Sequence, residues 1–198
     1  MLAVKRIALI LGAASLSGAA LAIQTAPPKV LNFEASGNLE SPHNLGCIQF
    51  NDASPKYNPV DLFRAAKVCL DSERFEAAFE LVRLAGVYGR FDVLRVADST
   101  AHQAVTVARM VVFESVPEDV KSKFYEVAKT HTYSAEERAI LCQSLKTLGP
   151  PTYRPTYMTK HGMSAFLAPN GTGVVKDFDP DRAWAEVLKS YVKCPEAG

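Results

Sequence analysis

Apolar residues recur every three or four positions through most of residues 58–148, the spacing that places them on one face of an α-helix. Asn58 followed by Pro59 predicts the start of the first helix, because Asn caps a first turn and Pro suits the first helical position. The apolar face of this helix contains Leu62, Ala65, Ala66, Cys69 and Leu70. A second helix follows a break at Asp71-Ser72, and so short a turn makes the two helices an antiparallel hairpin.

The second helix has an apolar face that consists of Phe75, Ala78, Phe79, Val82 and Ala85. Gly89 is predicted to end it, because glycine commonly follows the last turn of a helix. Asp92, and then Asp98 or Ser99, are candidate N-caps of further helices. Residues 101–113 are strongly apolar, which predicts a helix that other helices cover on most sides.

Two more helices are predicted before residue 150. Ser115 caps a helix that starts at Pro117 and continues to about residue 130, and residues 134–137 have the spacing of a capping box. The helix after the capping box ends at Gly149-Pro150-Pro151. The pattern predicts a mainly α protein of antiparallel helical hairpins, arranged as a repeat array or a bundle.

The last part of the chain, residues 150–198, has a different pattern. PPTYRPTY, residues 150–157, alternates proline with tyrosine and excludes a regular helix. Asn170-Gly171 lies between short apolar runs and predicts a small β-hairpin, because both turn residues must tolerate a positive φ. Asp179-Pro180 begins a final helix that should dock on the others through Trp184, Val187, Leu188 and Tyr191.

The N-terminal residues 1–22 have the pattern of a secretory signal peptide. Lys5 and Arg6 precede an uncharged stretch of about 16 residues, whereas a membrane-spanning helix needs roughly 20. Ala20-Leu21-Ala22 supplies the small residues that signal peptidase requires, so we expect cleavage after Ala22 and a periplasmic or secreted protein. No stable membrane insertion is expected after cleavage.

The organisation after cleavage is predicted as an extended, proline-containing arm over residues 23–57 and one helical domain over 58–198. That domain divides into a helical core, 58–149, and the remaining loop, hairpin and C-terminal helix. The leader removes two of 22 Lys and Arg, which leaves one net negative charge against 21 Asp and Glu. Such a balance gives no electrostatic reason to bind nucleic acid.

Four cysteines, Cys47, Cys69, Cys142 and Cys194, are an even number in a chain with a predicted leader. None are spaced as CxxC, so zinc or thioredoxin-like chemistry is disfavoured and two disulfides are predicted. Three pairings are possible. We favour Cys47–Cys69 with Cys142–Cys194, because each of these pairs joins neighbouring segments.

Residues 75–95, FEAAFELVRLAGVYGRFDVLR, resemble one unit of a Sel1-like or tetratricopeptide-type helical repeat. The resemblance lies in the small and apolar residues where paired helices approach, Ala77, Ala78, Leu81, Ala85, Gly86 and Gly89. No clear second copy follows at a period of about 34 residues. An ordinary helical hairpin uses the same small residues, so both interpretations stay open. Families with such repeats generally bind proteins, and the resemblance implies that function.

The C-terminal stretches RPTYMTKHGMSAF and DFDPDRAWAEVLKSYVKCP are similar to proteins that confer immunity to secreted antibacterial effectors such as phospholipases. This resemblance implies a non-enzymatic envelope protein that binds another protein, with a toxin as one possible partner. The proline- and tyrosine-rich segment and the predicted hairpin are the candidate contact surface. They hold residue types that are enriched at interfaces, namely Tyr153, Arg154, Tyr157, Met158 and His161.

The alternative function is a small secreted hydrolase. His161 would be oriented by Asp177 or Asp179, with Ser164 or Cys142 as the nucleophile. No GxSxG or HExxH motif surrounds these residues, so a structural loop histidine is the simpler interpretation. The four histidines are scattered with no i, i+4 pair, and neither a metal site nor a cofactor is predicted.

Overall fold

The computed structural model describes three stretches of the chain, residues 33–131, 133–168 and 170–195. The predicted signal peptide, residues 1–22, and the first part of the predicted arm lie outside them. The described residues belong to one compact unit that begins at Phe33. The rest of the arm has little regular structure, apart from the 3-10 turn η1 (Phe50–Asp52).

The first long helix, α1 (Pro59–Asp71), begins at the predicted cap. The Asn58 side chain accepts hydrogen bonds from the backbone N–H groups of Val60 and Asp61. The Asp61 carboxylate accepts one from the backbone of Asn58 in return, at 3.0 Å. This reciprocal arrangement satisfies N–H groups that have no partner within the helix, which fixes where α1 begins.

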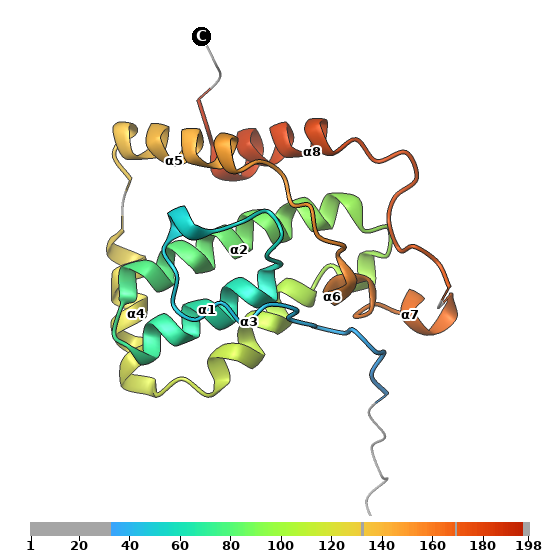
Figure 1. Cartoon of the computed structure of the whole chain (residues 1–198), viewed down its shortest axis with the longest axis horizontal. Helices are drawn as coiled ribbons and strands as arrows, with labels where there is room; N and C mark the ends of the chain where they lie inside the picture. Colours follow the sequence, from blue (N-terminus) through green and yellow to red (C-terminus); the bar gives the residue numbers. More distant parts are fainter. Residues whose placement is uncertain (1–32, 132, 169, 196–198) are drawn as a thin grey trace, which may run out of the picture. The chain divides into compact units, whose positions relative to one another are not determined.

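The second helix, α2 (Phe75–Arg95), follows after three residues and packs along α1 (Figure 1). It passes the predicted end at Gly89 and carries Asp92 inside the helix, so Asp92 is not an N-cap. The reason lies in the packing at Gly89. A Cβ built there would lie 2.7 Å from Val105 of the next long helix, so the absence of a side chain permits the close approach of two helices.

The helices after α2 do not repeat the first hairpin. Their bounds are α3 (Ala104–Glu114) and α4 (Glu118–Thr130), after the 3-10 turn η2 (Ser99–Ala101). Helix α3 contacts chiefly α1, whereas α4 contacts chiefly α2, and α2 is much longer than either. A repeat array requires equivalent pairs stacked on one another. The described helices therefore form a bundle and do not support the repeat arrangement.

Helix α3 is less covered than its apolar sequence predicts. Ala104, Ala108 and Phe113 are buried, but Met110 is 64% exposed and Val111 57% exposed. The correction follows from helix geometry, because only the face at positions three and four apart meets α1.

Helix α5 (Ala135–Leu148) and the C-terminal helix lie side by side next to α2 (Figure 1). The C-terminal helix begins as α8 (Pro180–Glu186) at the predicted Asp179 cap and continues as a π-helical turn, η3 (Val187–Val192). Trp184, Val187 and Leu188 are buried, as its docking face predicts, whereas Tyr191 is half exposed.

Both favoured disulfides are present, so Cys47, Cys69, Cys142 and Cys194 are all paired. Cys47–Cys69 ties the N-terminal arm to α1, and Cys142–Cys194 ties α5 to the end of the chain. The predicted end of α5 at Gly149 is also confirmed, with φ at 80°.

The predicted β-hairpin is absent from the described residues. Its first apolar run forms a short helix, α7 (Ser164–Leu167), which follows another, α6 (Thr156–Thr159). Its second run pairs elsewhere: Val174 makes an isolated antiparallel bridge to Val96, just after α2. The Val175 N–H donates to the Arg95 carbonyl at 2.8 Å. Backbone pairing with the end of α2 therefore takes the place of the predicted pairing across a local hairpin turn.

Candidate functional site

A buried carboxylate joins the proline- and tyrosine-rich segment to α2. Asp92 is fully buried and accepts hydrogen bonds from the hydroxyls of Tyr153 and Tyr157, each at 2.7 Å. Arg95 Nε donates to the other carboxylate oxygen, also at 2.7 Å. Burial raises the pKa of Asp92, and the charge of Arg95 opposes that shift. Burial also raises the pKa of both tyrosines well above the ordinary value, so both remain donors.

Two aromatic rings and two hydrogen bonds hold the guanidinium group of Arg95 in place. Its guanidinium lies 5.2 Å from the ring centre of Phe91 and 4.8 Å from that of Tyr153. Nη1 donates to the Tyr153 carbonyl at 3.0 Å. The remaining nitrogen, Nη2, is buried and has no hydrogen-bond partner among the described residues. The residue is only 8% exposed, so this donor group is fixed and largely removed from solvent.

Arg95 lines a cleft of about 880 Å³. The segment 151–160 forms one wall of it and residues 170–180 contribute another, with the end of α2 between them. The lining is apolar at Phe91 and Phe178 and basic at Arg95, Arg154 and Lys160, and its described lining contains no acidic side chain. Clefts of this size with a few fixed polar groups are the usual form of a ligand or partner site.

Two of the five predicted contact residues line this cleft and two are core residues. Arg154 is exposed and Tyr153 is half-buried, and both line the cleft. Tyr157 and Met158 are fully buried. A partner in the cleft would therefore contact Arg154, whereas Tyr157 is buried and holds the segment 151–160 in place.

His161, the fifth predicted contact residue, is bonded to the N-terminal arm. Its Nδ1 lies 2.8 Å from the amide oxygen of Asn38. Burial lowers the pKa of His161, which favours the neutral ring. Of the two proposed nucleophiles, Cys142 is unavailable because it forms a disulfide, and the Ser164 backbone N–H donates to Asp98. The arrangement matches a loop histidine with a structural partner.

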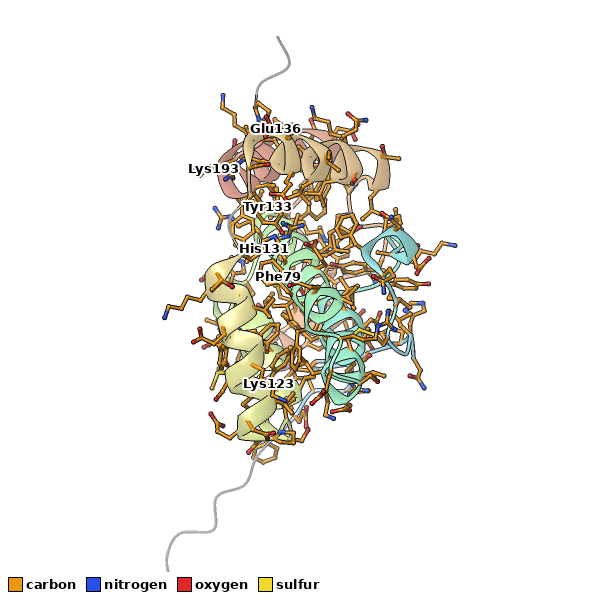
Figure 2. The ribbon with its side chains drawn as sticks, turned by 90° about the vertical axis from the view of Figure 1, so that its left-hand side faces the viewer. Phe79, Lys123, His131, Tyr133, Glu136 and Lys193 are labelled. Atoms are coloured by element: carbon orange, nitrogen blue, oxygen red, sulfur yellow. A yellow bond between two sulfur atoms is a disulfide. The ribbon has the colours of Figure 1, made fainter. Side chains whose placement is uncertain are left out.

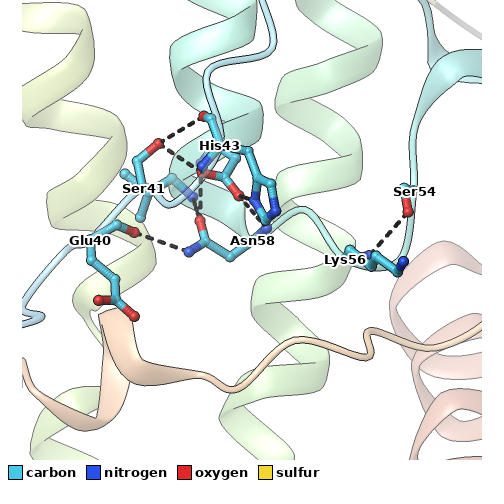
Figure 3. A network of polar contacts seen from close by, with 8 residues as sticks. Glu40, Ser41, His43, Ser54, Lys56 and Asn58 are labelled. Carbon is cyan, nitrogen blue, oxygen red and sulfur yellow. Dashed lines mark hydrogen bonds and ion pairs between the residues drawn. The ribbon is translucent and has the colours of Figure 1, made fainter.

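Another histidine resembles part of a catalytic group. His43 Nδ1 lies 2.9 Å from the Asp61 carboxylate, and Ser41 lies nearby (Figure 3). However, the Ser41 hydroxyl donates to Asp61 at 2.7 Å, and its other contact is the His43 carbonyl. A triad requires the hydroxyl to meet the imidazole. The cluster instead fastens the N-terminal arm to the cap of α1.

An exposed apolar patch lies on and beside α7, between the two segments that line the cleft. It consists of Met163, Phe166 and Leu167, the last of which is 78% exposed. Contiguous exposed apolar side chains mark contact surfaces more often than isolated ones do. Figure 1 shows α6 and α7 close together at one end of the bundle.

Asp98 anchors this patch to the bundle. Its carboxylate accepts hydrogen bonds from the Thr100 hydroxyl at 2.6 Å and from the Ser164 N–H at 2.7 Å. These bonds lower the pKa of Asp98 to about 2. Gly162 lies against the same carboxylate, and a Cβ there would approach Ala101 to 2.8 Å. The position of α7 is therefore set by a charged contact and by the small size of Gly162.

We expect the Asp98 contact to weaken between about pH 4 and pH 2. The folded pKa is lower than the ordinary value of about 3.9, so the ionised form stabilises the contact at higher pH and protonation removes it. An NMR titration of the Ser164 amide proton should show a midpoint near 2. Asp98→Asn should abolish that titration, and a wild-type midpoint near 4 would contradict the assignment.

A second cluster connects α2 with the link between α4 and α5. The His131 ring lies 4.6 Å from that of Phe79 and 4.3 Å from that of Tyr133, measured between centres (Figure 2). The Tyr133 hydroxyl donates to Glu80 at 2.9 Å, and Arg83 pairs with the same carboxylate. These contacts support the fold, although Arg83 Nη1 and His131 Nε2 are buried without a hydrogen-bond partner among the described residues.

Sequence reasoning missed Asp92 and Arg95 as site residues. An acidic and a basic residue three apart on one helix face signal such a pair. The predicted helix end at Gly89 hid that signal.

Among the residues described, no group of His, Cys, Asp and Glu could hold a metal ion. None of the described helices is long and apolar enough to cross a membrane.

Comparison with protein-family models, with curated proteins and with solved structures found no match to this chain. The functional argument therefore depends on the site itself.

Proposed function

We propose that this protein is exported, catalyses no reaction and binds another protein through the cleft and the neighbouring α7 patch. The observation that carries the proposal is the basic cleft of about 880 Å³ beside exposed apolar side chains. An apolar patch next to fixed polar groups is the usual composition of a protein interface. A secreted toxin is one class of partner, in line with the resemblance of the C-terminal residues.

Two features support export as part of the proposal. The leader pattern of residues 1–22 is typical of secretion, and both disulfides suit an oxidising compartment. A disulfide-bonded bundle also presents its surface with little rearrangement. Preorganisation of this kind lowers the cost of binding.

The proposal is tested by affinity purification from the native host with a matched pair of variants. Phe166→Ser with Leu167→Asp removes the α7 patch, whereas Ile140→Asp removes an equally exposed apolar residue, 67% exposed, on α5. We expect wild type and the Ile140 variant to retain one stoichiometric partner. The α7 variant should lose at least about tenfold in affinity by calorimetry, the effect of removing about 1.4 kcal/mol of contact.

Two results would contradict the proposal. Equal binding by the α7 variant would place the contact elsewhere on the surface. Turnover of an ester, peptide or glycan substrate that disappears in His161→Ala would favour the hydrolase alternative. The melting temperature of each variant serves as the control for folding.

A further inference from the structure

We propose that a groove between α2 and α3 binds an amphipathic anion, with its anionic head group on Arg90 and Arg109 and a slender apolar tail between the two helices. The groove has a volume of about 410 Å³ and shares no lining residue with the cleft that contains Arg95. The inference therefore goes beyond the proposed protein-binding surface and stands independently of it.

The groove is deep because α1 packs against both of the helices that form its walls. Helices α2 and α3 make few contacts with each other, and they meet closely where a Cβ on Gly89 would lie 2.7 Å from Val105. Phe63 of α1 also lines the groove although it is only 2% exposed, so the groove reaches down to α1. Such a shape suits a slender chain better than another helix, whose diameter with side chains is about 10 Å.

The walls of the groove are mainly apolar. The residues of α2 that line it lie on one face, because they are three or four positions apart, and they include Phe79, Val82, Gly86, Arg90 and Val93. From the first to the last of these residues the face is about 21 Å long at the usual helical rise. The half-exposed Tyr191 covers this face near its middle, with its hydroxyl 2.9 Å from where a Cβ of Gly86 would be. An extended alkyl chain would therefore find apolar contact along its length.

Two unpaired arginines supply the site for the head group. Arg90 follows the contact between the two helices by one residue on α2, and Arg109 follows it by one turn on α3, so both side chains start near the same point of the groove. Both are exposed, and neither has an ion-pair or hydrogen-bond partner among the described residues. The third arginine of the lining, Arg83, already pairs with Glu80.

The charge of the groove favours an anion. Its described lining contains no acidic side chain, so the two exposed guanidinium groups are uncompensated. An anion between them accepts charge-assisted hydrogen bonds from both, and an apolar tail on the same molecule removes the groove walls from water. A carboxylate and a phosphate monoester share this head-group chemistry, and the experiment separates them.

The test is an NMR titration of the intact, oxidised protein with decanoate below its micelle-forming concentration. Acetate supplies the head group alone, hexanoate shortens the tail, and decyl maltoside carries the same tail on a neutral head group. We expect decanoate to shift the signals of residues 82–93 and 105–109 and to bind at least about tenfold more tightly than each of these three controls. Tighter binding of decyl phosphate than of decanoate would support the groove and identify the head group as a phosphate.

Three variants locate the head group. Arg90→Gln and Arg109→Gln alter only exposed side chains, so both proteins should keep the melting temperature of wild type. Each should weaken decanoate several-fold, and the double variant at least about tenfold. Arg154→Gln is the matched control, because it removes an exposed arginine from the other cleft and should leave decanoate binding unchanged.

Equal binding of decanoate and decyl maltoside would overturn the inference, as would unchanged binding of decanoate by the double variant. Signal shifts confined to residues 153–160 would also contradict it, because they would place the ligand in the other cleft. An acidic helical peptide with blocked ends that binds the groove more tightly than decanoate would assign the groove to a partner helix instead.

Discussion

Asp92→Ala should lower the free energy of unfolding by about 3–5 kcal/mol, the typical effect of removing one member of a buried ion pair. The substitution leaves Arg95 without its anionic partner and takes the acceptor from two tyrosine hydroxyls. Each of the three groups would then have a hydrogen-bond donor without an acceptor. Water cannot replace the acceptor at Tyr157, which is fully buried, and can do so only in part at Tyr153, which is half-buried. Urea denaturation followed by circular dichroism measures the change.

Tyr157→Phe is the graded control for this prediction. It removes one donor and leaves the ring in place, so its effect should be about 1 kcal/mol. Asp181→Ala on α8 removes an exposed carboxylate and should change the stability by less than about 0.5 kcal/mol. If Asp92→Ala were no worse than Asp181→Ala, the network would not hold the segment 151–160 against α2.

The second large effect concerns the link between α5 and the chain end. Replacing Cys142 and Cys194 with Ala should lower the free energy of unfolding by about 4 kcal/mol in the chain-entropy model, since the closed loop spans 52 residues. Helix α5 packs mainly on η3, and its buried side chains are few, Cys142 and Leu145. The loss should therefore also free α5 locally.

Hydrogen exchange along residues 135–148 detects that local opening. We expect these amides to exchange several-fold faster in the double variant while those of α1 stay protected. Loss of Cys47–Cys69, which closes 22 residues, should cost about 3 kcal/mol and affect the arm instead. Unchanged exchange in α5 would mean that its side-chain packing alone is sufficient to hold it.

Local signals predicted where α1, α5 and α8 begin, whereas Ser115, the predicted cap of α4, instead follows the last turn of α3. The caps at Asn58, Ser134 and Asp179 each involve groups within three residues, so sequence spacing contains the whole interaction. The disulfide pairs could also be chosen, because each joins segments that are near in the chain order. Where a structure depends on such short-range contacts, the sequence is sufficient.

The failures occurred where a distant partner decided the outcome. Asn170-Gly171 is a good turn locally, but Val174 and Val175 pair with the end of α2. The apolar run before the turn is helical, and its first residue, Ser164, is hydrogen-bonded to Asp98. Gly89 is a good helix end locally, but α3 packs against it. Propensity is a weak prior, and tertiary contacts override it.

The candidate site shows the same division. The residue types of the segment 151–160 indicated a contact surface, and this segment does line the cleft. Its burial pattern could not be predicted, because the inward direction of Tyr157 depends on Asp92, which is 65 residues away in the chain. Arg95 was missed because the helix that carries it was predicted to end at Gly89.

The bridge between Cys142 and Cys194 has one more consequence. Both chain segments that form the cleft walls lie between these two cysteines, so they belong to a single covalent ring. An endoprotease that cuts the exposed stretch around residues 166–168 opens this ring without releasing a fragment. The two halves stay joined by the disulfide, so a molecule cut at this point keeps both walls of the cleft until a reductant separates them.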